Sequence, residues 1–360
     1  MVSDADELSA ERLEFIRMTR DSAAAVAPRD GDLKRVRALR YTVPGFDSAV
    51  WRQMAGLGWI GLHVAEEAGG AGMGMAESVA LDEELGAGLV PEPLIAGSLA
   101  AAMLACTSET ALLEAVLAGD VLVPVAWQGS PDATGLAAGQ VSLRHGVPMA
   151  ATAEHLLVPV RDGGRTRLLL LDAAEADAAP VQRQDGTTVS TLRIPGNAGR
   201  VVAEDVGAAL DRALDEATLR TAAYLLGVAE QAFSITLDYL KQRKQFGQPL
   251  AAFQALQHRA ADIKIQLVLT RASVEGAAAE LDAGVPPARR AAVVSRAKAR
   301  AADTALLMGR EAVQMHGAIG YADECDIGLF TRKAMAVANE YGSAMAHRAR
   351  FARLAEEVAA

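Results

Sequence analysis

The sequence has few cysteines, few aromatic residues and fewer basic than acidic side chains. Its two cysteines, Cys106 and Cys325, lie far apart and in no metal-ligand spacing. This usage excludes a small disulfide scaffold, argues against a structural zinc site and fits a reducing compartment. Aromatic residues make up only 4% of the chain, yet 51% of the residues are hydrophobic and 22% are charged, which excludes an intrinsically disordered protein.

No stretch is long and apolar enough to predict a transmembrane helix. The longest apolar run, 94–106, contains Gly97 and Ser98 and falls short of the roughly 18 residues that a span requires. The first residues are acidic and lack the apolar core of a signal peptide. Acidic residues outnumber basic ones by 45 to 35, which argues against a broad nucleic-acid-binding face. We therefore expect a cytoplasmic protein with no membrane span and no nucleic-acid partner.

Hydrophobic periodicity divides the chain into three parts. Up to about residue 118, apolar residues recur three and four positions apart, which is typical of helices. Short β-compatible runs separated by turn residues follow until about residue 205. Helical periodicity then returns over four long segments, at about 208–240, 253–283, 287–316 and 329–359. The pattern predicts a mainly α fold with an inserted β domain: an N-terminal helical domain over 1–118, a barrel-like β domain over 119–206 and a four-helix bundle over 207–360.

The sequence lacks the usual motifs of nucleophilic and metal catalysis. Its six histidines are scattered without HExxH spacing, and no G-x-S-x-G elbow occurs, so we expect no metal ion. The glycines at 69–74 resemble a dinucleotide-binding fingerprint only superficially, because no strand precedes them and no βαβ unit follows. The motifs therefore indicate neither metal chemistry nor a Rossmann fold.

A basic turn after the first long C-terminal helix is the most specific polar feature. Arg243, Gln245 and Phe246 lie just before Gly247, and the next helix begins close to Gln254. A guanidinium fork, the free N–H groups of a helix start and a flat ring favour binding of a phosphate-bearing ligand. A basic helix end that complements the helix dipole and stops at glycine would have the same composition. The residues alone support the ligand-binding interpretation and the helix-end interpretation about equally.

The segment RKQFGQPLAAFQALQ, which contains this turn, resembles the flavin-contacting turn of the acyl-CoA dehydrogenase family. Two further segments resemble the same family in the same order, WRQMAGLGWIGLHVAEEAGGAGMGMAESVALDEELG and QMHGAIGYADECDIGLFTRKAMA. The resemblance implies an FAD-dependent enzyme that removes an α proton and a β hydride from an acyl-CoA thioester. It also implies that electrons pass to an electron-transfer flavoprotein. An oxidase of the same fold, which passes electrons to oxygen, is an alternative that the sequence leaves open.

The resemblance also implies which residues contact the cofactor. Six positions match the family's FAD contacts: Arg243, Gln245, Phe246, Gln254, Gln314 and Gly317. The first three would contact the pyrophosphate and adenosine side, and the fourth would lie nearby. The last two would approach the same FAD from a neighbouring subunit, so the resemblance implies a homo- or hetero-oligomer, a dimer or tetramer of dehydrogenase-like chains.

The position of the family's catalytic base departs from the pattern. Where most members carry a Glu before Gly, this chain has Tyr341, and a phenol with an ordinary pKa near 10 is a poor base at neutral pH. Glu340 is adjacent, although one helical residue turns a side chain by about 100°, unless a loop or helix end at Gly342 relaxes that geometry. The family's alternative position, on the first bundle helix, holds Ala217 next to Glu216. Glu340 and Glu216 are therefore the candidate bases, and a solvated helix face is the competing interpretation for each.

The middle domain is shorter than is usual in the family. Trp127, Gly129 and Ser130 match part of a flavin-contacting stretch, which makes Ser130 a further candidate FAD contact, but the acid of that stretch and the Trp that walls the flavin are missing. Such abridged chains resemble actinobacterial dehydrogenases that work as paired, unlike subunits on bulky CoA thioesters such as steroid side chains. A base-deficient subunit that binds FAD or only supports the complex is the alternative to a self-sufficient enzyme.

Overall fold

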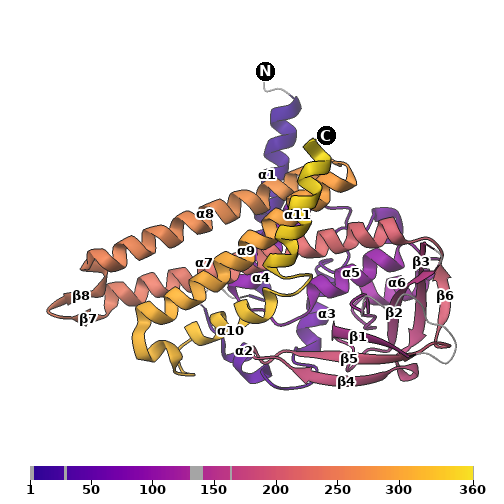
Figure 1. The fold of residues 1–360 in the computed structure, drawn as a ribbon, viewed down its shortest axis with the longest axis horizontal. Coiled ribbons are helices and arrows are strands. Elements are labelled where there is room, and N and C mark those ends of the chain that lie inside the picture. The colour runs from indigo at the N-terminus through magenta and orange to yellow at the C-terminus, as the bar shows by residue number, and fades with distance from the viewer. Residues whose placement is uncertain (1–3, 28–30, 130–140, 163, 360) are drawn as a thin grey trace. The chain divides into compact units, whose positions relative to one another are not determined.

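The computed structural model describes residues 4–27, 31–129, 141–162 and 164–359 (Figure 1). Contacts within the chain group it into two compact units. The first unit consists of Met1–Val36, Gly74–Val90 and Thr218–Ala360, and the second of Arg37–Met73 and Pro91–Ala217. Of the described residues predicted above to contact FAD or to act as base, all belong to the first unit except Glu216.

Long helices build the first unit. They are α1 (Asp4–Ser22), α4 (Met75–Ala87), most of α7 (Gly207–Gln242), α8 (Gln254–Asp282), α9 (Pro287–His316), α10 (Ile327–Val337) and α11 (Ala344–Ala359). Figure 1 shows α8 and α9 lying side by side, with α11 packed on α9. Small buried residues along α9, including Ala297, Ala301 and Ala305, allow these helices to approach closely.

Helices α4 and α7 cross with their backbones in direct contact. A Cβ atom on Gly227 would lie 1.9 Å from the carbonyl oxygen of Glu83, and one on Gly86 would lie 2.1 Å from that of Tyr224. Any larger residue at either glycine would force the two helices apart. This contact explains why glycine occupies both positions inside regular helices.

A charged network links α1, α4 and α8 around Glu83. The Glu83 carboxylate accepts hydrogen bonds from Arg20, at 2.7 Å, and from Arg271, at 3.0 Å between Nη1 and Oε2. Burial alone would raise the pKa of Glu83, but the hydrogen bonds from Arg271 and Arg20 outweigh it and hold that pKa below its ordinary value. Glu83 is therefore ionised in the folded protein at neutral pH.

The second unit combines short helices with two small sheets. Its helices include α3 (Ser48–Gly56), α5 (Leu94–Leu104) and α6 (Thr110–Leu117), and α2 (Lys34–Leu39) lies where the chain passes into it. Trp51 of α3 packs against Gly97 of α5, where a Cβ atom would lie 2.4 Å from the indole ring. The indole therefore occupies the space that a side chain at position 97 would need.

The sheets each have three antiparallel strands. One has the order β1 (Val141–Pro148), β5 (Thr188–Pro195), β4 (Asp177–Gln182), and the other has the order β2 (His155–Asp162), β3 (Arg165–Asp172), β6 (Arg200–Ala203). Alternating residues of these strands, among them Leu156, Val158, Leu171, Leu192 and Ile194, form a shared apolar core. The short strands predicted from the sequence are thus largely present.

The fold class predicted from the sequence is confirmed: N-terminal helices, a β region and C-terminal helices follow one another. Two details of the prediction are wrong. The segment 329–359 is not one helix, because the chain turns between Val337 and Ala344, with φ values of 55° at Tyr341 and 117° at Gly342. The first of the β-compatible runs, VLVPVAW at 121–127, was expected to be a strand but forms only an isolated bridge, at Val125. The boundaries of the three predicted domains stay a prediction.

None of the described helices combines the length and the apolar character that a bilayer span requires.

Candidate functional site

A tight hairpin joins α7 to α8 and carries three of the predicted contact residues. Strand β7 (Lys244–Gln245) pairs with β8 (Gln248–Pro249), and the two turn residues, Phe246 and Gly247, have φ values of 54° and 85°. Positive φ at both central residues is the geometry of a two-residue hairpin turn that matches strand twist. The amide N–H of Leu250 donates to the Arg243 carbonyl at 2.8 Å and closes the base of the hairpin.

The hairpin presents its side chains to solvent. Arg243 and Gln245 are exposed, and Phe246 is 88% exposed, although its ring makes an edge contact with Phe253 at a centroid distance of 6.1 Å. Gln254 is exposed at the first position of α8, where backbone N–H groups lack helical partners. A guanidinium, an amide, an open ring and a helix start thus lie together at one end of the bundle, which suits an anionic ligand with a flat group.

The end of α9 supplies the other two predicted contact residues. Gln314 is exposed in the last turn of the helix, and Gly317 is exposed with φ of 70° at the start of a short 3-10 helix, η5 (Gly317–Tyr321). Apart from Gly317 and its two chain neighbours, no heavy atom of the described residues lies within 4 Å of where a Cβ on Gly317 would be, so its positive φ, not crowding, favours glycine. The backbone at the end of α9 is accessible to solvent around Gly317.

Tyr239, near the end of α7, and His316, at the end of α9, contact each other within one chain. Their rings stack at a centroid distance of 4.3 Å, and the Tyr239 hydroxyl donates to the His316 carbonyl at 3.3 Å. Burial lowers the pKa of His316, although its contact with the Ala312 carbonyl opposes that shift. A neutral imidazole therefore holds the end of α9 beside the last turns of α7.

The turn after α10 carries Glu340 and Tyr341, and Lys298 of α9 holds it from inside the protein. Lys298 is 0% exposed, and its ammonium donates to the carbonyls of Ala338 at 2.8 Å and Gly342 at 3.1 Å. Burial lowers the pKa of Lys298 to about 8, although the carboxylate of Glu340 opposes the shift. The sequence analysis missed this lysine; its signal is a single lysine within an alanine-rich helix.

A buried ion pair lies near the phenol of Tyr341. Arg220 of α7 donates to Asp82 of α4, at 2.6 Å from Nε and 3.3 Å from Nη2, and both side chains are almost fully buried. Burial and the Glu340 carboxylate raise the pKa of Tyr341. Of the two members of the ion pair, Arg220 lowers that pKa and Asp82 raises it. The phenol therefore stays protonated at neutral pH, as expected for a group that is a poor base. Sequence analysis did not foresee this pair, because its members are 138 positions apart.

The two candidate bases lie in different settings. Glu340 is half-buried on the turn that Lys298 holds, where the backbone is not helical. Glu216 lies within the regular helix α7 and accepts a hydrogen bond from Arg212, one helical turn earlier, at 2.8 Å. Its neighbour Ala217 is buried. Because Glu340 lies in a turn, the rotation of about 100° between successive helical residues does not apply to it. That rotation does apply to Glu216, which lies in a regular helix.

In the middle region, Ser130 lies outside the described residues, so its predicted contact with FAD stays a prediction. Trp127 is half-buried. Gly129 forms an isolated bridge with Arg144, and a Cβ there would lie 2.4 Å from that guanidinium. Arg144 is buried and donates to the Pro159 carbonyl at 3.2 Å, which makes it part of the sheet interior. Among the described residues, no three His, Cys, Asp or Glu side chains gather to hold a metal ion.

Family models match both helical parts of the chain. Residues 10–117 match the acyl-CoA dehydrogenase N-terminal domain, and residues 207–355 match the acyl-CoA dehydrogenase C-terminal domain. The second match contains the hairpin, the end of α9 and the turn that carries Glu340. Solved proteins of the same fold carry FAD or FADH2.

Relatives and solved structures extend the likeness over nearly the whole chain. "Acyl-CoA dehydrogenase IpdE2" of Mycobacterium tuberculosis is 30% identical over 318 residues, which cover 88% of this chain and 90% of that protein. A variant of the Tcur3481-Tcur3483 steroid ACAD superposes with a TM-score of 0.84 at 28% identity, covering 98% of this chain and 99% of the other. The ChsE4-ChsE5 complex from Mycobacterium tuberculosis has the same fold, with a TM-score of 0.84 at 23% identity over 96% of this chain and 97% of that one. The chain therefore belongs to the acyl-CoA dehydrogenase family, oxidoreductases that act on acyl-CoA with FAD as cofactor.

Proposed function

We propose that this chain takes part in the α,β-dehydrogenation of an acyl-CoA thioester and that an electron-transfer flavoprotein receives the electrons. The observation that carries the proposal is the exposed hairpin at 243–249, where a guanidinium and an open aromatic ring lie beside the start of α8. Membership of the family supplies the reaction class. The hairpin supports the further statement that this chain itself binds the cofactor.

The side chains at the hairpin fit FAD. Arg243 offers a charge-assisted fork to a pyrophosphate, and Gln245 and Gln254 offer amide groups beside it. Phe246, being 88% exposed, contributes little to the core and leaves its ring available to an adenosine. When bound, FAD supplies the hydride-accepting chemistry, and the chain contributes binding and orientation.

The proposal assigns Gln314 and Gly317 to a cofactor held mainly by a second subunit. Both residues are exposed, and the space around Gly317 is open, as such a contact requires. An oligomer in which each cofactor site draws on two chains is therefore part of the proposed function.

For removal of the α proton we favour Glu340 over Glu216. Glu340 lies on a turn whose positive φ at Tyr341 removes the objection that a one-residue offset points its side chain elsewhere. The ammonium of Lys298 lies close enough to interact with its carboxylate. In this role the substrate's α proton would pass to a carboxylate oxygen of Glu340. Glu216 already accepts a hydrogen bond from Arg212.

A second candidate function is that of a base-deficient subunit in a heteromeric dehydrogenase. It is favoured by Tyr341, a protonated phenol at the position next to Gly342 where the family usually has its base. Two similar solved proteins support this candidate, because one is named a complex of two chains, ChsE4-ChsE5, and another is named a steroid ACAD. In that case the substrate would be a bulky CoA thioester such as a steroid side chain, and the partner would supply the base.

Expression of the chain alone and together with a dehydrogenase-like partner separates the two candidates. The flavin absorbance of the purified protein measures cofactor binding, and its bleaching on addition of an acyl-CoA measures turnover. If Glu340 is the base, Glu340→Gln abolishes bleaching in the chain alone, whereas Glu216→Gln and Tyr341→Phe retain it. Full bleaching by Glu340→Gln in the chain alone shows that another residue of this chain is the base, whereas bleaching only with the partner present supports the base-deficient subunit. A colourless protein in both preparations contradicts the proposed function.

The electron acceptor is tested on the same preparations. Reoxidation of the bleached flavin by electron-transfer flavoprotein, without peroxide in air-saturated buffer, is the expected result. Stoichiometric peroxide release would identify an oxidase.

A further inference from the structure

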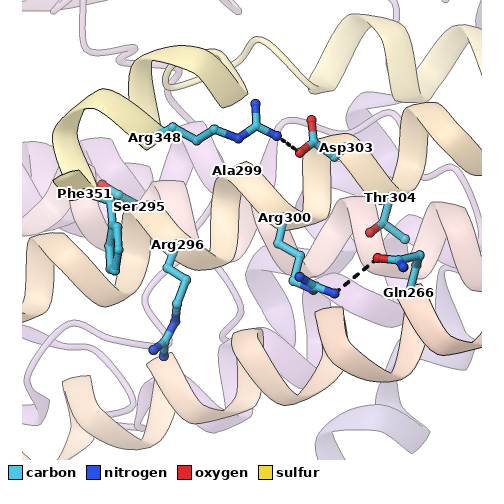
Figure 2. Close-up of a pocket in the computed structure, with 9 residues that line it drawn as sticks. All are labelled: Gln266, Ser295, Arg296, Ala299, Arg300, Asp303, Thr304, Arg348 and Phe351. Atoms are coloured by element: carbon cyan, nitrogen blue, oxygen red, sulfur yellow. Dashed lines mark hydrogen bonds and ion pairs between the residues drawn. The ribbon is translucent and has the colours of Figure 1, made fainter.

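A positively charged cavity lies away from the hairpin at 243–249, among α8, α9 and α11. Its volume is about 290 Å³ (Figure 2). Three arginines line it, Arg296 and Arg300 from α9 and Arg348 from α11, with one carboxylate, Asp303. The cavity therefore has an excess of two positive charges in a chain whose net charge is -10.

Two of the three guanidinium groups are not neutralised by a carboxylate among the described residues. Figure 2 shows Arg348 directed to Asp303, with which it forms an ion pair. Arg300 instead donates to the neutral amide oxygen of Gln266 at 3.2 Å, and its Nε is buried without a hydrogen-bond partner in the described structure. Arg296 is exposed at the rim of the cavity and forms no ion pair within the described part of the chain, and Figure 2 shows its side chain directed away from that of Arg300.

The spacing of Arg296 and Arg300 favours a bound anion that neutralises them. Arg296 and Arg300 are four positions apart on one helix, so they share a face, where like charges repel and destabilise the helix. A buried N–H without an acceptor is a further cost. An anion in the cavity would screen the repulsion and offer an acceptor to Arg300, because guanidinium forks match the oxygen geometry of phosphate and carboxylate.

We infer that this cavity is a binding site for a small phosphate dianion. Its volume lies at the lower limit of small-molecule sites, which favours inorganic phosphate or a small phosphomonoester over a larger polyanion. Phe351 lines one side of the cavity and gives it an apolar wall that a flat group carried by the phosphate would contact. None of the residues that line the cavity belongs to the hairpin at 243–249 or to the turn at 338–342.

Titration calorimetry with inorganic phosphate tests the site. The protein is saturated with FAD, so that the flavin site is filled, and chloride keeps the ionic strength constant. We expect saturable binding that Arg300→Gln weakens at least tenfold and that Arg300→Lys, which keeps the charge but loses the fork, weakens less. Arg310→Gln is the matched control, since it removes the same charge from an exposed position of the same helix and should change the affinity less than twofold.

A second titration distinguishes the source of the phosphate. Adenosine 5′-monophosphate should bind more tightly than inorganic phosphate, and Phe351→Ala should abolish that difference, if the occupant is a phosphomonoester with a flat group. Equal affinities identify free phosphate. Absence of saturable binding, or equal affinities for the unsubstituted, Arg300→Gln and Arg310→Gln proteins, would overturn the inference. Flavin absorbance of the same samples reports the cofactor site separately, so failure of one proposal is distinguishable from failure of the other.

Discussion

The exposed hairpin at 243–249 and the buried polar residues around the 338–342 turn use charge in opposite ways. In the hairpin, Arg243 faces solvent, where a ligand can reach it. In the interior, Arg220 is held by Asp82, and Lys298 donates to two backbone carbonyls. A charge inside a protein needs compensation by the protein itself, whereas a charge at the surface can be compensated by a ligand. Substitutions in the two regions should therefore affect different properties: stability in the interior, cofactor affinity at the hairpin.

The largest effect is expected from the interior ion pair. Asp82→Asn leaves the guanidinium of Arg220 buried without its counter-charge, and we expect the free energy of unfolding to fall by roughly 3 to 5 kcal/mol. Urea denaturation followed by circular dichroism measures this change. Asp238→Asn is the control, because Asp238 pairs with Lys241 at 3.0 Å on the surface and its loss should cost less than about 1 kcal/mol. Equal losses in the two variants would contradict the assignment of Asp82 to a buried structural pair.

At the hairpin, Arg243→Gln should affect cofactor binding and leave the fold intact. Loss of a charged hydrogen bond to the pyrophosphate should weaken FAD about tenfold to a hundredfold, equivalent to roughly 1.5 to 3 kcal/mol. The unfolding free energy of the FAD-free protein should change by less than about 0.5 kcal/mol, since the side chain is exposed. Fluorescence titration with FAD measures the first quantity. Lys241→Gln removes a nearby exposed charge on α7 and should retain normal affinity; a similar loss there would indicate only a general charge effect.

Lys298→Met should lower stability moderately and should also change how the free energy of unfolding depends on pH. The carbonyls of Ala338 and Gly342 lose their donor, which should cost roughly 1 to 3 kcal/mol at neutral pH. Because burial lowers the pKa of Lys298 to about 8 from 10.5, the unfolded chain binds more protons between these two values, and this lysine adds to stability as the pH rises through that window. Denaturation at several pH values should show that rise in the unsubstituted protein and a smaller one in Lys298→Met. Lys264→Met, at an exposed position of α8, serves as control and should retain the full rise.

The same contrast explains what the sequence could predict. The hairpin residues are contiguous, and their chemistry follows from local features: a helix end, two turn residues and a helix start. The helix and strand pattern is also local, which is why the fold class was correct. The turn at 338–342 was predicted only as an option at Gly342, inside a segment expected to be one helix, and the φ values of Tyr341 and Gly342 establish the break. Asp82 and Arg220 escaped because the fold brings together residues 138 positions apart.

The smallest expected effect is the contribution of Glu83 to the free energy of unfolding, which should disappear at acid pH. Its hydrogen bonds from Arg271 and Arg20 hold its pKa below the ordinary 4.5 against the effect of burial. As the pH falls below about 4.5, the unfolded chain takes up the proton first, so the stability that Glu83 contributes is complete above this pH and is lost as the pH falls through its folded value.

Glu83→Gln should therefore be less stable than the unsubstituted protein at pH 7, and the gap in unfolding free energy should shrink as the pH is lowered below about 4.5. Denaturation curves at a series of pH values measure that gap. Glu275→Gln is the matched control, because Glu275 lies 3.3 Å from the same Arg271 but is 55% exposed, where solvent screens its charge. A constant gap for Glu83→Gln, or an equally large pH-dependent gap for Glu275→Gln, would show that burial does not distinguish the two carboxylates. The rule that interior charges serve stability and surface charges serve binding would then fail in this chain.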